Sequence, residues 1–162
     1  MPPERRIAFS EFQHDDGAAD PRLVDAIASG DHGRVLAALT EARLLVPVVA
    51  MLGDVSYDES GLARDKSADM AVVLVTGRDG RRALLAFTGT TALAAWQPDA
   101  RPIPATSTLA ATAAVQEGAA AIVIDIAGPR TVVVETDDVQ HLAAGHRVIR
   151  LADGTHAWAV DS

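Results

Sequence analysis

The sequence predicts an α+β protein, a mixed α/β fold with a single mixed β-sheet and packed helices. A strand–turn–strand–helix unit, a duplicated ββα unit, occurs at residues 70–96 and again at residues 120–144. Two capped helical segments precede the repeat and predict an N-terminal helical hairpin. Apolar residues make up 49% of the 162 positions, which is enough for one buried core.

The N-terminal region divides into an arm and the start of the domain. Residues 1–19 lack hydrophobic periodicity, so we expect a flexible arm followed by a single domain over residues 20–162. Asp20 can cap a helix whose first position suits Pro21, and Gly30 suits its C-terminal end. Asp31 can cap a second helix, so the two segments predict a short antiparallel helical hairpin.

The next segment combines an apolar run with a polar loop. Residues 44–52 are rich in β-formers, but Pro47 interrupts them and cannot donate to a ladder. We therefore expect an edge strand, or one that starts at Pro47. An exposed edge favours pairing with a second copy, so a homodimer is a hypothesis that Pro47 itself opposes. Residues 53–69 are polar, and a loop of this length is expected to be functional or mobile.

The first repeated unit has continuously apolar strands at Met70–Val75 and Ala83–Phe87, which predicts cover on both faces. Asp79-Gly80 is typical of a two-residue hairpin loop in which both central residues have positive φ. Residues 88–91 offer threonine hydroxyls as caps for a helix at Thr91–Trp96.

The second half continues with an extended, proline-containing crossover at residues 97–105. An alanine-rich helix at Thr106–Glu117 follows, with Ser107 or Thr108 as its cap and Gly118 as its end. The remaining predicted elements are strands at 120–126 and 131–134, a helix at 137–144, and a hairpin formed by 147–151 and 156–160.

Composition excludes several classes of function. The net charge of −8 argues against nucleic acid and anionic membranes as partners. The chain has no cysteine, which excludes disulfides, thiolate metal sites and cysteine nucleophiles. No apolar run is long enough for a membrane span, and we expect a cytoplasmic protein without a cofactor.

Motifs for catalysis are weak. The sequence has neither a glycine-rich nucleotide-binding signature nor a nucleophile elbow. His141 and His146 are five residues apart, a spacing that does not place two ligands on one helical face, so we expect no metal site. Asp125 ends an apolar strand. It is either a buried carboxylate with a raised pKa or, as we favour, a strand-end carboxylate that faces water or bonds a loop amide. No catalytic residue is assigned.

A composite surface is the main candidate for binding, because tryptophan and arginine are enriched at binding hot spots. The alternatives are that Trp96 fills the core and that Lys66 forms a local ion pair. The candidate residues are Asp65, Lys66, Ser67, Asp69, Thr88, Trp96 and Arg101.

Four segments together resemble the SseB N-terminal-domain family, in its actinobacterial branch: Asp65–Met70, Asp79–Thr88, Trp96 and Ala100–Pro104. The strand that ends in Phe-Thr before a helix is the most recognisable, and the resemblance covers roughly residues 42–134. The family typically has serine after Phe-Thr, where this chain has Gly89. The resemblance implies a small cytoplasmic α/β-type domain and no catalytic residues to transfer.

Three functional hypotheses follow. The first is a non-enzymatic protein-interaction or regulatory module that presents residues 53–69 and 96–104 to an unknown protein partner or to its own copy. The alternative is a small-molecule or anion-binding regulatory domain that uses the helix N-termini after Thr88 and Thr136. The least favoured is a hydrolase-type enzyme that uses Asp125 or another carboxylate with a histidine.

Overall fold

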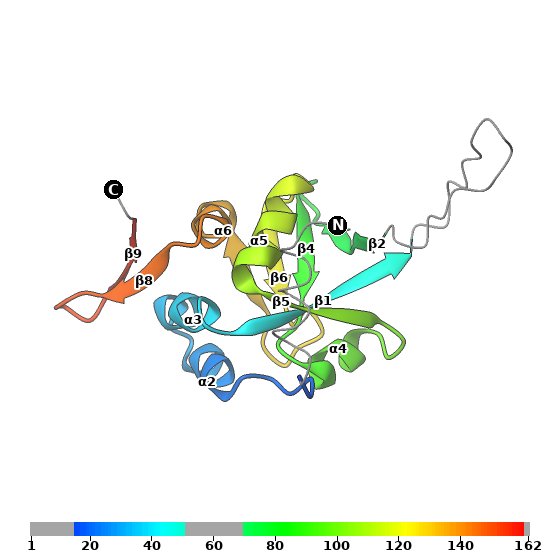
Figure 1. The fold of residues 1–162 in the computed structure, drawn as a ribbon, viewed down its shortest axis with the longest axis horizontal. Coiled ribbons are helices and arrows are strands. Elements are labelled where there is room, and N and C mark those ends of the chain that lie inside the picture. Colours follow the sequence, from blue (N-terminus) through cyan, green and yellow to red (C-terminus); the bar gives the residue numbers. More distant parts are fainter. Residues whose placement is uncertain (1–14, 51–69, 161–162) are drawn as a thin grey trace, which may run out of the picture.

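The computed structural model describes residues 15–50 and 70–160 (Figure 1). The α+β class is confirmed, although hydrogen bonding divides the strands among three sheets instead of one. No helix in these described ranges has the length and apolar character to cross a membrane. The elements in chain order are α2 (Pro21–Ser29), α3 (His32–Leu39), β1 (Arg43–Ala50), β2 (Met70–Val72), β3 (Leu74–Thr76), β4 (Arg82–Ala86), α4 (Thr90–Trp96), β5 (Arg101–Thr106), α5 (Ser107–Gln116), β6 (Ala121–Ile124), β7 (Val132–Glu135), α6 (Thr136–Ala143), β8 (Arg147–Arg150) and β9 (His156–Ala159).

The N-terminal helical hairpin has the predicted caps. The Asp20 carboxylate accepts a hydrogen bond from the Arg22 N–H at 2.9 Å, and the Asp31 carboxylate accepts one from the Gly33 N–H at 3.0 Å. Gly30 ends α2 with φ 73°, in the left-handed region that glycine occupies without steric penalty. Helix α2 therefore begins and ends where the sequence predicts, and α3 begins where it predicts.

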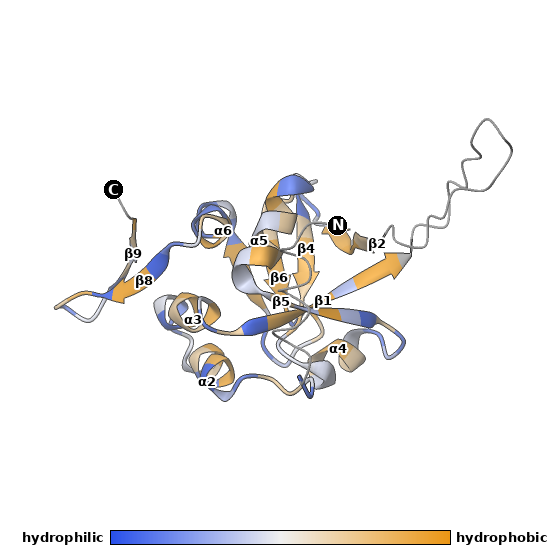
Figure 2. Ribbon diagram, viewed as in Figure 1, coloured by the Kyte–Doolittle hydropathy of each residue, from blue (hydrophilic) through white to orange (hydrophobic). Residues whose placement is uncertain are grey.

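The two repeated units meet in a four-stranded sheet with the order β3-β4-β6-β7. Strands β4 and β6 are parallel, and each is antiparallel to the other strand of its own hairpin. Alternate residues of β4 and its extension enter two separate hydrophobic clusters. Leu84 and Ala86 belong to the larger cluster, whereas Leu85 and Phe87 belong to the smaller one. Both faces are covered, as the apolar pattern predicts, and Figure 2 shows hydrophobic residues along these strands.

The prediction that Pro47 marks an edge strand is wrong, because β1 is the middle strand of the sheet β2-β1-β5. Pro47 lies opposite Pro102 of β5. Leu45 and Phe87 each donate a backbone N–H to the other's carbonyl oxygen at 2.8 Å. Hydrogen-bonding direction alternates along a strand, so the nitrogen of Pro47 also points away from β5. The proline therefore removes no hydrogen bond to β5, and the edge argument for a homodimer has no basis at β1.

The first hairpin differs from its prediction in two ways. Its leading strand divides at Val73, so that β2 pairs with β1 and β3 pairs with β4. The loop spans residues 77–81, and of Asp79 and Gly80 only the glycine has positive φ, 82°. The Gly80 N–H donates to the Gly77 carbonyl at 3.0 Å. This is the longer hairpin loop with a glycine bulge, not a two-residue turn.

The proline-containing crossover is extended only in its second half, which is strand β5. Its first half is a turn, in which the Ala100 N–H donates to the Gln97 carbonyl at 3.1 Å. The cap of α5 is Thr106, whose hydroxyl accepts the Leu109 N–H at 3.1 Å, and neither Ser107 nor Thr108 has that role. The Ser107 hydroxyl instead donates to the Leu39 carbonyl at 2.5 Å. The predicted C-terminal hairpin is present as β8–β9, which packs against α3.

Candidate functional site

A cleft of about 710 Å³ opens at the carboxyl ends of the parallel strands β4 and β6. Helix α2, helix α4 and the loop of residues 125–130 enclose it. In open α/β sheets, ligands bind outside the carboxyl ends of parallel strands. The cleft is therefore the first place to look for function in the described part of the chain.

Asp125 and Thr88 form the polar floor of this cleft. The Thr88 N–H donates to Oδ1 of Asp125 at 2.8 Å, and the Thr88 hydroxyl donates to Oδ2 at 2.8 Å. The side chain of Asp125 is buried, with 7% of the residue exposed. Burial raises the pKa of Asp125 above its ordinary value, and the two bonds from Thr88 oppose this effect. The expected strand-end position and amide bond are both present, but the carboxylate is buried and does not face open water.

The loop after β6 holds this carboxylate in place. Asp125 has φ 57°, and it is the one non-glycine residue with positive φ in the described ranges. Aspartate is among the side chains that tolerate this conformation. Its backbone carbonyl accepts the Gly128 N–H at 2.9 Å and the Thr131 hydroxyl at 3.0 Å. The floor of the cleft is thus preorganised by side-chain and backbone bonds together.

The walls of the cleft are mainly apolar. Val24 and Ile27 of α2 face Ala92 and Ala95 of α4 across it. Val24 is 44% exposed although it belongs to a well-capped helix beside the core. Small alanine side chains on α4 leave the space open. Arg130 contributes the positive charge among the lining residues and is exposed.

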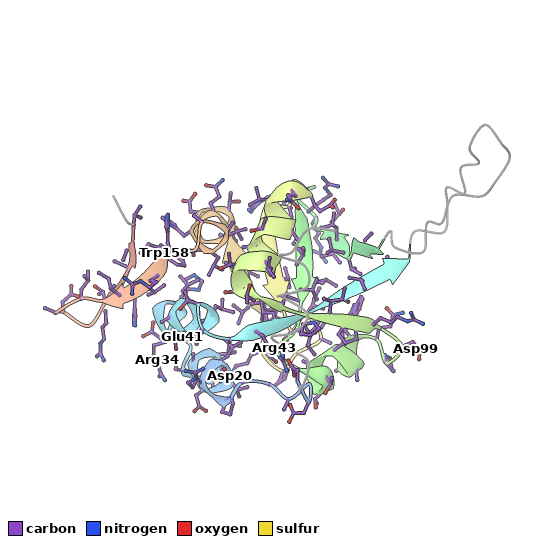
Figure 3. The ribbon with its side chains drawn as sticks, viewed as in Figure 1. Asp20, Arg34, Glu41, Arg43, Asp99 and Trp158 are labelled. Atoms are coloured by element: carbon purple, nitrogen blue, oxygen red, sulfur yellow. The ribbon has the colours of Figure 1, made fainter. Side chains whose placement is uncertain are left out.

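Arg43 lies in β1 (Figure 3). Its hydrogen bonds attach residues 15–18 to the body of the protein. Its guanidinium donates to Asp15 Oδ1 at 2.8 Å, to the Ala18 carbonyl at 2.7 Å and to the Thr88 carbonyl at 2.8 Å. The hydrogen bond from Arg43 lowers the pKa of Asp15 below its ordinary value. Of the predicted arm, residues 1–14 lie outside the described residues, whereas residues 15–19 are bonded to the fold.

The same segment explains the glycine at position 89. The Thr90 N–H donates to the Gly17 carbonyl at 2.8 Å, so the chain of residues 17–19 lies directly on the turn between β4 and α4. A Cβ atom at Gly89 would lie 2.7 Å from the backbone nitrogen of Ala19. Gly89 is the N-cap of α4 and makes no side-chain bond, so the predicted hydroxyl cap is absent. Its lack of a side chain lets Ala19 complete the cleft wall.

The predicted binding residues are not brought together as one surface in the described ranges. Thr88 lies in the cleft, whereas Trp96 packs against Phe87 with ring centroids 5.5 Å apart. Trp96 is half-buried against the smaller core cluster, which fits the alternative interpretation. Arg101 is exposed at the start of β5. Asp65, Lys66, Ser67 and Asp69 lie outside the described residues.

Paired anion sites at two helix N-termini are not supported. Strand β7 is antiparallel to β6, and β6 is parallel to β4, so α4 and α6 begin at opposite ends of the sheet. At α4, the N–H groups of Thr88 and Thr90 already bond to Asp125 and to Gly17. The first turn of α6 carries Asp137 and Asp138, whose charges repel an anion.

Among the residues that the structure describes, no histidine lines the cleft, so they do not supply the carboxylate–histidine pair that the enzyme hypothesis requires. A pair of that type does lie elsewhere, where His32 Nε2 is 3.0 Å from Asp138 Oδ2. The other oxygen of Asp138 accepts the Trp158 indole N–H at 2.9 Å. Asp138 therefore joins α3 and β9 to α6.

Sequence reasoning missed Arg43 and the apolar walls of the cleft. A signal for the floor was nevertheless present. Thr88 follows one apolar strand and Asp125 follows another, and the carboxyl ends of parallel strands meet at one edge of a sheet. No comparable signal identifies the walls, because they come from two helices far apart in sequence.

Comparison with known proteins identifies the family. The family model described as the SseB protein N-terminal domain matches residues 12–141. Because the match extends over most of the sequence, the chain belongs to this family. Neither the curated proteins nor the solved structures gave a match.

Proposed function

We propose that the protein is a non-enzymatic regulatory module that binds a small, largely apolar molecule in the cleft above Asp125. The main support is a buried carboxylate, oriented by Thr88, at the floor of an apolar cleft. The cleft volume of about 710 Å³ lies within the range of about 300–1,000 Å³ that is typical of small-molecule sites. Such sites combine apolar walls with a few oriented polar groups.

The floor selects for a ligand with a hydrogen-bond donor. Each carboxylate oxygen of Asp125 accepts one bond from Thr88 and retains a further lone pair. A buried carboxylate is stabilised most by a positive partner. We therefore expect an apolar body that carries a protonated amine, with hydroxyl and amide donors as weaker substitutes.

Ligand binding would couple parts of the chain that are distant in sequence. The walls come from α2 and α4, and Ala19 belongs to the segment that Arg43 attaches. A ligand that contacts all of them stabilises their docking to the sheet, because it binds the folded state and not the unfolded chain. This coupling is the basis for a regulatory role.

The test is a thermal-shift screen of small apolar amines and their hydroxyl analogues on the full chain. A compound at 100 times its Kd adds about 2.7 kcal/mol to the free energy of unfolding. Ala95→Phe fills the cleft and should abolish the shift. Ala94→Phe is the matched control, because Ala94 is exposed on the same helix and does not line the cleft. The proposal fails if no compound shifts the wild type, or if hits shift both variants equally.

Protein interaction through residues 96–104 is a second candidate. Its support is that Arg101 is exposed on β5, the outer strand of its sheet, where an extended partner could pair. Affinity capture with wild type and Arg101→Ala tests it, with Arg150→Ala as an exposed-arginine control. A partner lost only with Arg101→Ala supports this surface, whereas full retention by both variants removes it.

A further inference from the structure

A second feature, which shares no residue with the lining of the cleft, involves two histidines at the end of α6. The Nδ1 atoms of His141 and His146 lie 2.8 Å apart. The two rings have centroids 5.1 Å apart, and both residues are half-buried. Two imidazole nitrogens thus lie within hydrogen-bond distance of each other on half-buried side chains that solvent can approach.

The turn after α6 explains why residues five apart meet. The Gly145 N–H donates to the Leu142 carbonyl at 3.0 Å, and the His146 N–H donates to the His141 carbonyl at 3.1 Å. Gly145 has φ 76°. These features define a Schellman motif, which returns the chain so that the second residue past the C-cap Ala144 contacts the last turn of the helix. The five-residue spacing was judged only by the geometry of one helical face, although the helix was predicted to end at residue 144, so the contact was missed.

We infer that His141 and His146 form a chelating site for a divalent transition-metal ion, with Cu²⁺ and Ni²⁺ preferred over Zn²⁺. Metal–imidazole bonds of about 2.0–2.1 Å at right angles place two nitrogens about 2.8–3.0 Å apart, as observed for this pair. A tetrahedral ion with the same bond lengths requires about 3.3 Å. Square-planar or octahedral geometry, which Cu²⁺ and Ni²⁺ adopt, therefore fits with less movement of the rings.

The surroundings are suited to a cation with two protein ligands. The described residues contain no group of three or more His, Cys, Asp or Glu side chains that could hold a metal, so water would fill the remaining positions. The net charge of the chain is −8, which favours cations over anions around the protein as a whole. Without a metal, a hydrogen bond between the two Nδ1 atoms accounts for their short separation.

Metal binding at this pair has a built-in optical reporter. The Trp158 indole stacks on His141, with centroids 4.9 Å apart and planes 12° apart, between the β8–β9 hairpin and α6 (Figure 3). The chain has two tryptophans, and Trp96→Phe leaves Trp158 as the only one. Cu²⁺ bound to His141 should quench the fluorescence of Trp158 strongly, because the ion is paramagnetic and its ligand His141 stacks on the indole.

The test titrates the full chain carrying Trp96→Phe with CuCl₂, NiCl₂ and ZnCl₂ in a non-chelating buffer. We expect saturable, one-to-one quenching by Cu²⁺. His146→Asn should weaken binding about a hundredfold, because it removes one of two rigidly linked ligands. His156→Asn is the control for an accessible histidine outside the pair and should bind Cu²⁺ as the parent does.

Electron paramagnetic resonance of the Cu²⁺ complex provides a second readout that does not depend on Trp158. The spectrum of the parent is expected to show two imidazole nitrogens coordinated to Cu²⁺, and the spectrum of His146→Asn is expected to show one. Equal Cu²⁺ affinity in the parent and in His146→Asn overturns the site, as does a spectrum without two imidazoles. Tighter binding of Zn²⁺ than of Ni²⁺ overturns the geometric preference.

Discussion

Replacement of Asp125 tests whether the carboxylate at the cleft floor orients Thr88 as the contacts indicate. Asp125→Ala removes both acceptors at 2.8 Å and leaves the buried N–H and hydroxyl of Thr88 without their partner. Each unsatisfied buried group costs about 1–3 kcal/mol, and water entering the open cleft favours the lower end. Alanine at φ 57° adds about 1 kcal/mol. We expect a loss of about 3 kcal/mol in the free energy of unfolding.

Asp125→Asn should behave differently from Asp125→Ala. The amide oxygen can accept the Thr88 N–H, and the amide nitrogen can donate to the Thr88 hydroxyl. Asparagine is also favoured at positive φ. We expect the free energy of unfolding at neutral pH to stay within about 1 kcal/mol of the wild type, because a pair of hydrogen bonds is kept and no charge is buried.

The pH dependence separates the carboxylate from its amide analogue. The pKa of Asp125 is raised above its ordinary value of 3.8 in the folded protein. Between pH 3.8 and the raised pKa of the folded protein, the folded state binds more protons than the unfolded state. The free energy of unfolding therefore falls as pH rises through this interval. The contribution of protonated Asp125 to the free energy of unfolding is therefore complete below pH 3.8. It is lost as pH increases through the pKa of Asp125 in the folded protein. Asp125→Asn lacks this dependence.

Urea denaturation at a series of pH values from 3.5 to 7.5 (roughly the span of a raised carboxyl pKa), followed by circular dichroism, gives the needed free energies. The wild type should lose stability relative to Asp125→Asn as pH rises across the lower part of this range. If the difference in free energy of unfolding between the wild type and Asp125→Asn does not change with pH, the interpretation of Asp125 as a buried, ionisable carboxylate is refuted. An alanine variant as stable as the wild type would refute the role of the two Thr88 bonds.

Three further outcomes are expected elsewhere in the fold. Arg43→Met should destabilise the fold by about 2 kcal/mol and increase hydrogen exchange in residues 15–19. The wild type loses stability as pH falls through the lowered pKa of Asp15, and Arg43→Met should lack this pH-dependent loss. Gly89→Ser should release the same segment and cost about 1–3 kcal/mol, because its Cβ would lie 2.7 Å from the Ala19 nitrogen; unchanged exchange in that segment would contradict both expectations. Pro102→Thr restores an N–H on the outer strand β5 and should promote self-association, measured by sedimentation velocity against the wild type.

The sequence predicted those parts of the fold that depend on local signals. Asp20 and Asp31 bond to the first-turn amides of their helices, as the capping rule requires. The uninterrupted apolar strands correctly indicated cover on both faces of the sheet. In each case the physical cause lies within a few residues of the feature, so one sequence is sufficient to find it.

The errors arose where the outcome depends on distant partners. Pro47 was predicted to mark an edge strand or the start of a strand. Its effect depends on which side of β1 its nitrogen faces, and that is set by the pairing of Leu45 with Phe87. The His141–His146 contact depends on where α6 ends. The cleft walls, including Val24, depend on the docking of α2 beside α4. None of these relations has a period or spacing in the sequence.

The way in which the two repeated units pair explains why the polar site forms at Thr88 and Asp125, and not at the two helix N-termini after Thr88 and Thr136. Alignment of the two units pairs Thr88 with Thr136, yet the antiparallel β7 carries Thr136 to the opposite end of the sheet. The parallel pairing of β4 with β6 instead brings the end of the first unit's second strand beside the end of the second unit's first strand. Thr88 therefore meets Asp125, and the polar floor joins the two units. A ligand at this floor would contact both units, which makes their junction the position where binding can alter the stability of the whole sheet.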